Sequence, residues 1–221
     1  MNLCHVRLVP NSEGDFSIDT PVLARSEEEI DAALHMWLDL GAHQEGATST
    51  VWEPSEMIIR DAVEADDTIV GELLVQAYLT QFAKKLPDVS YSAERLADLR
   101  NQSARRASAS VLVAEIDGRI VGTVTLYPAG ASGSEAWIAG AADLRLLAIH
   151  PEFQGRGLSR RLLDAAEALA RKWRVPAICL HTRQGASGVA RLYQSRGYVR
   201  DETGDIDHRP SLYLEAHVLK L

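Results

Sequence analysis

The stretch LRLLAIHPEFQGRGLSRRLL, residues 144–163, contains the strongest pattern in the chain. An apolar run ends at Ile149, Pro151 follows, and leucines spaced for a helix begin after Gly157. Glycine is a poor helix former, so two glycines at the start of a helix indicate that a ligand comes close to the backbone there. The unpaired N–H groups and partial positive charge of a helix N-terminus suit an anion, usually a phosphate.

Two known phosphate motifs do not fit these residues. A P-loop needs Gly-Lys-Ser/Thr, which does not occur in the sequence. A dinucleotide fingerprint, as in an NADH-dependent oxidoreductase, needs a third glycine where Arg160 stands, and no matching acidic residue ends a following strand. From the glycines alone, the other interpretation is a plain helix start with a flexible turn.

The segments around this turn predict strands and helices in alternation. Asp117-Gly118 is a favoured pair for a tight hairpin turn between two apolar runs. Val175-Pro176 ends the helix that follows the glycine turn. The predicted elements are a strand at 57–62, helices at 66–82 and 92–107, a hairpin at 110–128, a strand at 142–151, a helix from 157, a strand at 177–182, a helix at 188–197 and a strand at 211–221.

Residues 1–50 form a separate pattern, a short N-terminal β/α appendage with a linker. Strands are predicted at 4–9 and 16–24, and Ser26 with Glu29 three residues later is a capping box that opens a helix. Gly41 is a natural stop for that helix. The predicted domains are therefore 1–50 for the appendage and 57–221 for the main domain.

The composition limits the class of protein. Lys and Arg number 23 against 31 Asp and Glu, a formal charge of −8, which disfavours nucleic-acid partners and mildly favours cationic substrates. No apolar run is long enough for a membrane span, and the first residues lack the apolar core of a signal peptide, so we expect a cytoplasmic protein. Cys4 and Cys179 do not make a disulfide framework, and the seven histidines form no local metal-ligand cluster.

Two motifs together resemble the GNAT superfamily of N-acetyltransferases. Gln154-Gly155-Arg156-Gly157-Leu158-Ser159 resembles its acetyl-CoA signature, with Ser159 in place of the usual last glycine or alanine. ARLYQSRGY, residues 190–198, resembles a later family segment, with Tyr198 for phenylalanine. The resemblance covers about three quarters of the chain and implies a mixed α/β GNAT fold (the acyl-CoA N-acyltransferase fold), with a mostly antiparallel sheet flanked by helices.

The resemblance also implies a site for acetyl-CoA as co-substrate, without a metal. The backbone of Leu147, Ala148 and Ile149 would pair with the pantetheine arm like another strand. The pyrophosphate would lie on the amides of the glycine turn, with added charge from two arginines. The residues so assigned are Gln154, Gly155, Arg156, Gly157, Leu158, Ser159 and Arg160.

The catalytic residues are expected on either side of the thioester, because the amine must lose a proton and the thiolate gain one. Tyr193 matches the family tyrosine that protonates the thiolate; a helix aromatic packed on the sheet is its alternative. Asp143 is the candidate base, directly or through water, and its alternative is a structural contact with Arg145. Asp143 alternates with Arg145 and Leu147, which predicts that the three share one face of a strand. His181 is another candidate base.

The sequence thus predicts transfer of an acetyl group from acetyl-CoA to a primary amine by direct attack. The acceptor is a small-molecule or peptide amine that the sequence does not identify. The alternative is a non-catalytic acyl-CoA-binding or regulatory module, because Ala186 stands where the family often has asparagine and Ser159 departs from the signature. Strand-type segments near both ends are compatible with a homodimer.

Overall fold

The computed structural model describes residues 2–6, 20–24, 57–85, 92–210 and 212–221. The chain divides into two compact units, Met1–Glu56 and Met57–Leu221. In the first unit β1 (Asn2–Val6) and β2 (Thr20–Ala24) form an antiparallel pair, so strands lie in both segments where the sequence predicts them. The helix predicted after Ser26 lies outside the described residues.

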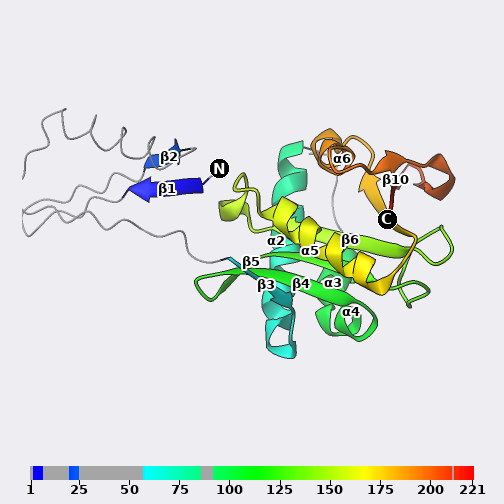
Figure 1. The fold of residues 1–221 in the computed structure, drawn as a ribbon, viewed down its shortest axis with the longest axis horizontal. Coiled ribbons are helices and arrows are strands. Elements are labelled where there is room, and N and C mark those ends of the chain that lie inside the picture. The colour runs from blue at the N-terminus through cyan, green and yellow to red at the C-terminus, as the bar shows by residue number, and fades with distance from the viewer. Residues whose placement is uncertain (1, 7–19, 25–56, 86–91, 211) are drawn as a thin grey trace, which may run out of the picture. The chain divides into compact units, whose positions relative to one another are not determined.

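The second unit is built on an eight-stranded sheet in the order β3-β4-β5-β6-β7-β10-β8, with β9 paired to β10 (Figure 1). Neighbouring strands are antiparallel except β6 and β7, which are parallel. This confirms the predicted mixed, mostly antiparallel sheet. Its strands are β3 (Ile58–Asp61), β4 (Ser110–Ile116), β5 (Arg119–Tyr127), β6 (Ala142–Ile149), β7 (Ala177–Arg183), β8 (Val199–Arg200), β9 (Ile206–His208) and β10 (Leu212–Lys220).

Helices cover both faces of this sheet, as Figure 1 shows for α5 and α2. On one face, α5 (Leu158–Trp173) and α6 (Ser187–Gln194) bury a core that includes Leu144, Leu162 and Tyr193. On the other face, α2 (Asp67–Lys85) and α3 (Ala93–Arg100) bury a core that includes Leu74 and Val113. We call these the α5 face and the α2 face.

The helix predicted over 92–107 is two helices, α3 and α4 (Gln102–Ser108), with a break at Asn101 (φ −76°, ψ 63°). Arg105 is only 5% exposed, and its guanidinium donates to the carbonyl oxygens of Asp98 and Leu99 at the end of α3. Helix-end carbonyls lack partners within their own helix. The break therefore satisfies both the buried cation and the end of α3.

A β-bulge in β6 changes which way its side chains point. Thr125 pairs with Arg145 and Thr123 with Ala148, so two residues of β6 lie opposite one residue of β5. Leu146 adopts the left-handed region (φ 55°), which costs a non-glycine residue roughly 1 kcal/mol or more. Beyond the bulge, Leu147 packs on the α5 face and Ala148 on the α2 face.

The prediction that Asp143, Arg145 and Leu147 share one face is therefore wrong for Leu147. Simple alternation would keep all three on one face. The extra residue of the bulge turns the strand at Leu146, and Leu147 then packs with the α5-face core.

The bulge lies beside a split in the sheet. β6 and β7 pair only at Ala142–Ile178 and Asp143–Cys179. Beyond Asp143 the two strands no longer pair, although β6 continues to Ile149 and β7 to Arg183. In this part of β6, backbone groups that face away from β5 have no partner strand, which is an edge that an extended ligand can complete.

Candidate active site

The glycine turn joins the end of β6 to the start of α5. After a short 3-10 turn at Pro151–Phe153, Gly155 and Gly157 both adopt left-handed backbone conformations, with φ of 80° and 76°. This conformation favours glycine because a Cβ would be strained. A Cβ at either position would meet no heavy atom within 4 Å, so the outer side of the turn is open.

The open turn presents unpaired amides to solvent. The N–H groups of Gly157, Leu158 and Ser159 donate to no acceptor within the described residues. The first turn of α5 carries no acidic residue, and the Arg160 side chain is exposed beside it. Amides, helix dipole and guanidinium together favour an anion at this point.

Tyr193 lies on the α5 face, on helix α6. It is 5% exposed, and its ring packs edge-on against Tyr198 with 5.4 Å between ring centroids. Burial raises the pKa of its phenol above the ordinary value, so the hydroxyl stays protonated at neutral pH. At the start of this helix Ala186 provides no side-chain cap, which leaves backbone groups there without the contact that asparagine would make.

Asp143 lies where the β6–β7 pairing ends. Its side chain has no exposed area, Oδ2 accepts a hydrogen bond from the Glu135 N–H (2.7 Å), and Oδ1 has no hydrogen-bond partner among the described residues. Burial raises the pKa of the Asp143 carboxyl to about 6. The alternative contact with Arg145 is not formed, because Arg145 donates to the Gly133 carbonyl and pairs with Glu135. Asp143 is therefore a buried carboxyl whose pKa is raised well above its usual range.

The loop that joins β5 to β6, residues 128–141, contributes Trp137 and also Glu135, which the sequence did not single out. Glu135 pairs with Arg145 (2.9 Å), and its second oxygen lies 4.0 Å from Nδ1 of His181. Trp137 donates to Asp201 (2.9 Å), and its ring packs on Gly204, where a Cβ would come within 2.2 Å of it. The sequence gives no sign of these contacts, because they depend on how an irregular loop folds back over the sheet.

The comparisons with known proteins agree with this geometry. The family model described as Acetyltransferase (GNAT) family matches residues 72–198, more than half of the chain. The chain belongs to the GNAT acetyltransferase family. The fold and family expected from the two sequence motifs are thus confirmed.

Solved structures resemble the GNAT domain over about three quarters of the chain. A GNAT acetyltransferase from Staphylococcus aureus Mu50 has a TM-score of 0.59 and 15% identity, covering 75% of this chain and 99% of its own. The protein yncA of Salmonella typhimurium, solved with its cofactor acetyl-CoA, has a TM-score of 0.54 and 25% identity, covering 76% and 95%. A GNAT acetyltransferase from Elizabethkingia anophelis with acetyl-CoA bound has a TM-score of 0.52 and 18% identity, covering 75% and 98%.

The GNAT domain therefore brings the predicted site residues to two places around the split. The glycine turn, Leu147, Ile149 and Tyr193 belong with the α5 face, whereas the Ala148 side chain packs on the α2 face. Asp143 belongs instead with the loop 128–141 and His181. Among the described residues, no group of His, Cys, Asp or Glu is arranged to hold a metal ion, and no helix is long and apolar enough to cross a membrane.

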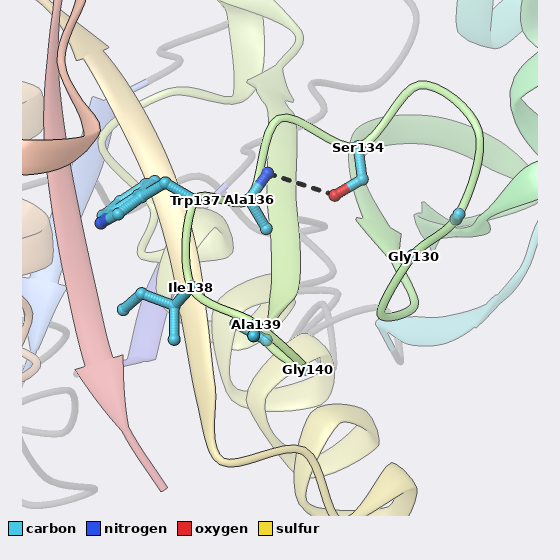
Figure 2. A pocket seen from close by; sticks show the side chains of 9 residues that line it. Gly130, Ser134, Ala136, Trp137, Ile138, Ala139 and Gly140 are labelled. Atoms are coloured by element: carbon cyan, nitrogen blue, oxygen red, sulfur yellow. Dashed lines mark hydrogen bonds between the residues drawn. The ribbon is translucent and has the colours of Figure 1, made fainter.

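Two surface hollows of the GNAT domain are lined by neither of the candidate catalytic residues. Figure 2 shows one of about 340 Å³ along the loop 128–141, where the Ala136 N–H donates to Ser134 Oγ and the lining has no titratable side chain. The other, of about 310 Å³, lies between α6 and β10 and includes Arg191 and Glu215. Neither includes Tyr193 or Asp143. We therefore place the candidate site at the split.

Proposed function

We propose that residues 57–221 are the catalytic domain of an N-acetyltransferase that moves an acetyl group from acetyl-CoA to a primary amine by direct attack. The observation that carries this proposal is the continuity of an unpaired strand edge with unpaired helix amides. The edge at 147–149 accepts an extended arm, and the turn at 154–160 accepts the pyrophosphate. The bound acetyl-CoA in the Salmonella and Elizabethkingia structures supports this choice of acetyl donor.

The protonated phenol of Tyr193 is the proposed general acid. It lies on the same face as the glycine turn, and no carboxylate among the described residues accepts a hydrogen bond from it. A phenol that stays protonated at neutral pH is available to give its proton to the departing thiolate as negative charge develops on the sulfur. Its raised pKa keeps it in the donor form across the physiological range.

Asp143 is the proposed base on the other side of the split. Its pKa of about 6 matches the task, because a base works best when its pKa is close to the working pH. Its carboxyl has no exposed area, so it reaches the amine through an intervening group rather than by contact. The acceptor is a small-molecule or peptide amine, and residues 1–50 are proposed as an appendage outside the catalytic domain.

Titration calorimetry with acetyl-CoA tests the binding half of the proposal. Gly157→Glu places a side chain at φ 76° and a negative charge on the amides that would hold the phosphates. Gly130→Glu is the matched control, because Gly130 is exposed, has φ 72° and also has open space around its Cβ. We expect micromolar binding by the parent and the control, and binding weaker by about 100-fold or more in Gly157→Glu. Equal binding by all three would remove the turn from the site.

Tyr193→Phe separates an enzyme from a non-catalytic acyl-CoA-binding module. The substitution removes only a hydroxyl, so acetyl-CoA binding and folding should be retained. Turnover with a primary amine that the parent acetylates, measured by release of the CoA thiol, should fall by about 100-fold or more, the usual scale for a lost general acid. Undiminished turnover would show that another group protonates the thiolate. A parent that binds acetyl-CoA but acetylates no primary amine would support the binding module.

A further inference from the structure

The Glu135 carboxylate and the His181 imidazole lie close together, with a gap of 4.0 Å between Oε2 and Nδ1. His181 lies on β7, two residues beyond Cys179, the last residue that pairs with β6. Glu135 lies on the loop 128–141, and its Oε2 is 4.0 Å from Nδ1 of His181. This distance is too long for a hydrogen bond.

The hydrogen-bond partners of His181 decide which nitrogen carries the proton. Nε2 lies 2.8 Å from the carbonyl oxygen of Gly204. A carbonyl only accepts, so Nε2 must donate, and Nδ1 of the neutral ring is left with a lone pair. The Nδ1 lone pair and the Glu135 carboxylate are therefore two acceptors that need a shared donor.

The surrounding contacts hold this gap open. The Glu135 backbone is fixed by Asp143, and its Oε1 by Arg145 (2.9 Å). The ring of His181 is held by the Gly204 carbonyl and by Trp137, with 5.2 Å between ring centroids. Each of these contacts restrains one of the two residues.

The two side chains differ in how far they are exposed to solvent. The His181 side chain is 6% exposed, and that of Glu135 is 37% exposed. An incoming cation therefore meets Glu135 from solvent and His181 behind it. The other titratable groups that interact electrostatically around His181 are Asp143 on β6 and His217 on β10, and Arg145 neutralises part of the Glu135 charge.

We infer that the gap between Glu135 Oε2 and His181 Nδ1 is the seat of the acceptor's ammonium group, and that His181 Nδ1 takes its proton. An ammonium nitrogen carries three N–H donors, and one placed about 2.8 Å from each acceptor atom fits a gap of this width. This inference rests on the proposed function: His181 takes the proton, and Asp143 acts on the amine only through its electrostatic interaction with the imidazole.

The proton transfer balances without any further reactant. One N–H bond of the ammonium breaks, its electron pair stays on the amine nitrogen, and a new N–H bond forms at Nδ1. The imidazolium is stabilised by the Glu135 and Asp143 carboxyl groups, and Glu135, the exposed member, passes the proton to solvent. The free amine is left with the lone pair that attack on a thioester requires.

The experiment compares Glu135→Gln and His181→Gln with the parent, using the best acceptor from a panel of primary amines and measuring release of the CoA thiol. Glutamine at 181 can still donate to the Gly204 carbonyl but cannot become a cation, so the anchor is kept and the base is lost. Glu202→Gln is the control, because it removes an exposed carboxylate from the neighbouring turn at Glu202–Gly204. Acetyl-CoA calorimetry on each variant verifies the fold.

We expect Glu135→Gln to raise KM for the amine about 10-fold to 100-fold with a smaller change in kcat, the scale of a lost hydrogen bond to a charged group. His181→Gln should lower kcat/KM at pH 7 about 100-fold or more. This defect should shrink as the pH approaches the amine's own pKa, because the amine then arrives already deprotonated. A merely structural role for His181 would give a defect that does not depend on pH.

The failures are distinguishable. If the parent acetylates an amine and both variants behave like Glu202→Gln, the seat is overturned and the proposed function stands. If the parent binds acetyl-CoA but acetylates no amine in the panel, the proposed function fails and the seat fails with it.

Discussion

The Asp143 carboxyl is fully buried, in surroundings that disfavour its charged form. It has no exposed area and accepts one hydrogen bond from the Glu135 N–H, and its Oδ1 has no partner in the part of the chain that the structure describes. Its pKa rises from 3.8 to about 6 because burial disfavours the charge. The folded state therefore binds this proton more tightly than the unfolded state does, so the stabilisation is complete below pH 4 and is lost as the pH rises through 6.

The free energy of unfolding of Asp143→Asn, relative to that of the parent, should therefore be greater at pH 8 than at pH 4. Asparagine keeps an oxygen for the Glu135 N–H and carries no charge. A shift of about two pKa units corresponds to roughly 3 kcal/mol, which is the upper bound of the relative gain. Urea unfolding of both proteins at the two pH values measures it. A stability difference that is the same at pH 4 and pH 8 would contradict an ionised, buried Asp143.

At the scale of elements, β6 decides where the ligand can lie. The His150 N–H bonds to Val121 and Ala148 pairs with Thr123, so the N–H of Ile149 points away from β5. That direction faces β7, which no longer pairs with this part of β6. The unpaired edge of β6 is a local property of three or four residues.

Hydrogen exchange of the Ile149 amide tests this edge. Without ligand, we expect exchange far faster than that of Val113, which lies fully buried in the middle of the sheet on β4. Saturating acetyl-CoA should slow Ile149 by about 10-fold or more, because the pantetheine arm would accept its hydrogen bond, and leave Val113 unchanged. Protection of Ile149 in the free protein, measured by NMR, would show that the edge is already paired.

Most elements of the GNAT domain could be predicted from local sequence, and their exceptions have physical causes. The hairpin at Asp117-Gly118 follows from turn chemistry, and both residues have positive φ. The bulge could not be predicted, because Leu146 is a residue type that disfavours the left-handed conformation it adopts. The break between α3 and α4 depends on burial of Arg105, which no helix pattern reveals.

At the scale of the whole chain, the sequence located one side of the candidate site better than the other. The glycine turn and Tyr193 are carried by motifs with fixed spacing, and the structure gives the turn open amides. Glu135 and His181 lie 46 positions apart and meet only because β7 lies beside β6 and a loop folds over both. The acidic balance of −8 agrees with a cationic acceptor but locates no residue.

The parting of β6 from β7 also bears on how the domain holds together. Two residue pairs, Ala142–Ile178 and Asp143–Cys179, are the only ladder between the β3–β6 part of the sheet and the β7–β10–β8 part within the described residues. The two parts of the sheet are thus joined by a short ladder, and α5 packs across it. A molecule that binds along β6 beyond Asp143, where β7 no longer pairs, takes the place of a missing strand. The acetyl donor would then complete the sheet each time it binds, and the sheet would open again when the product CoA leaves.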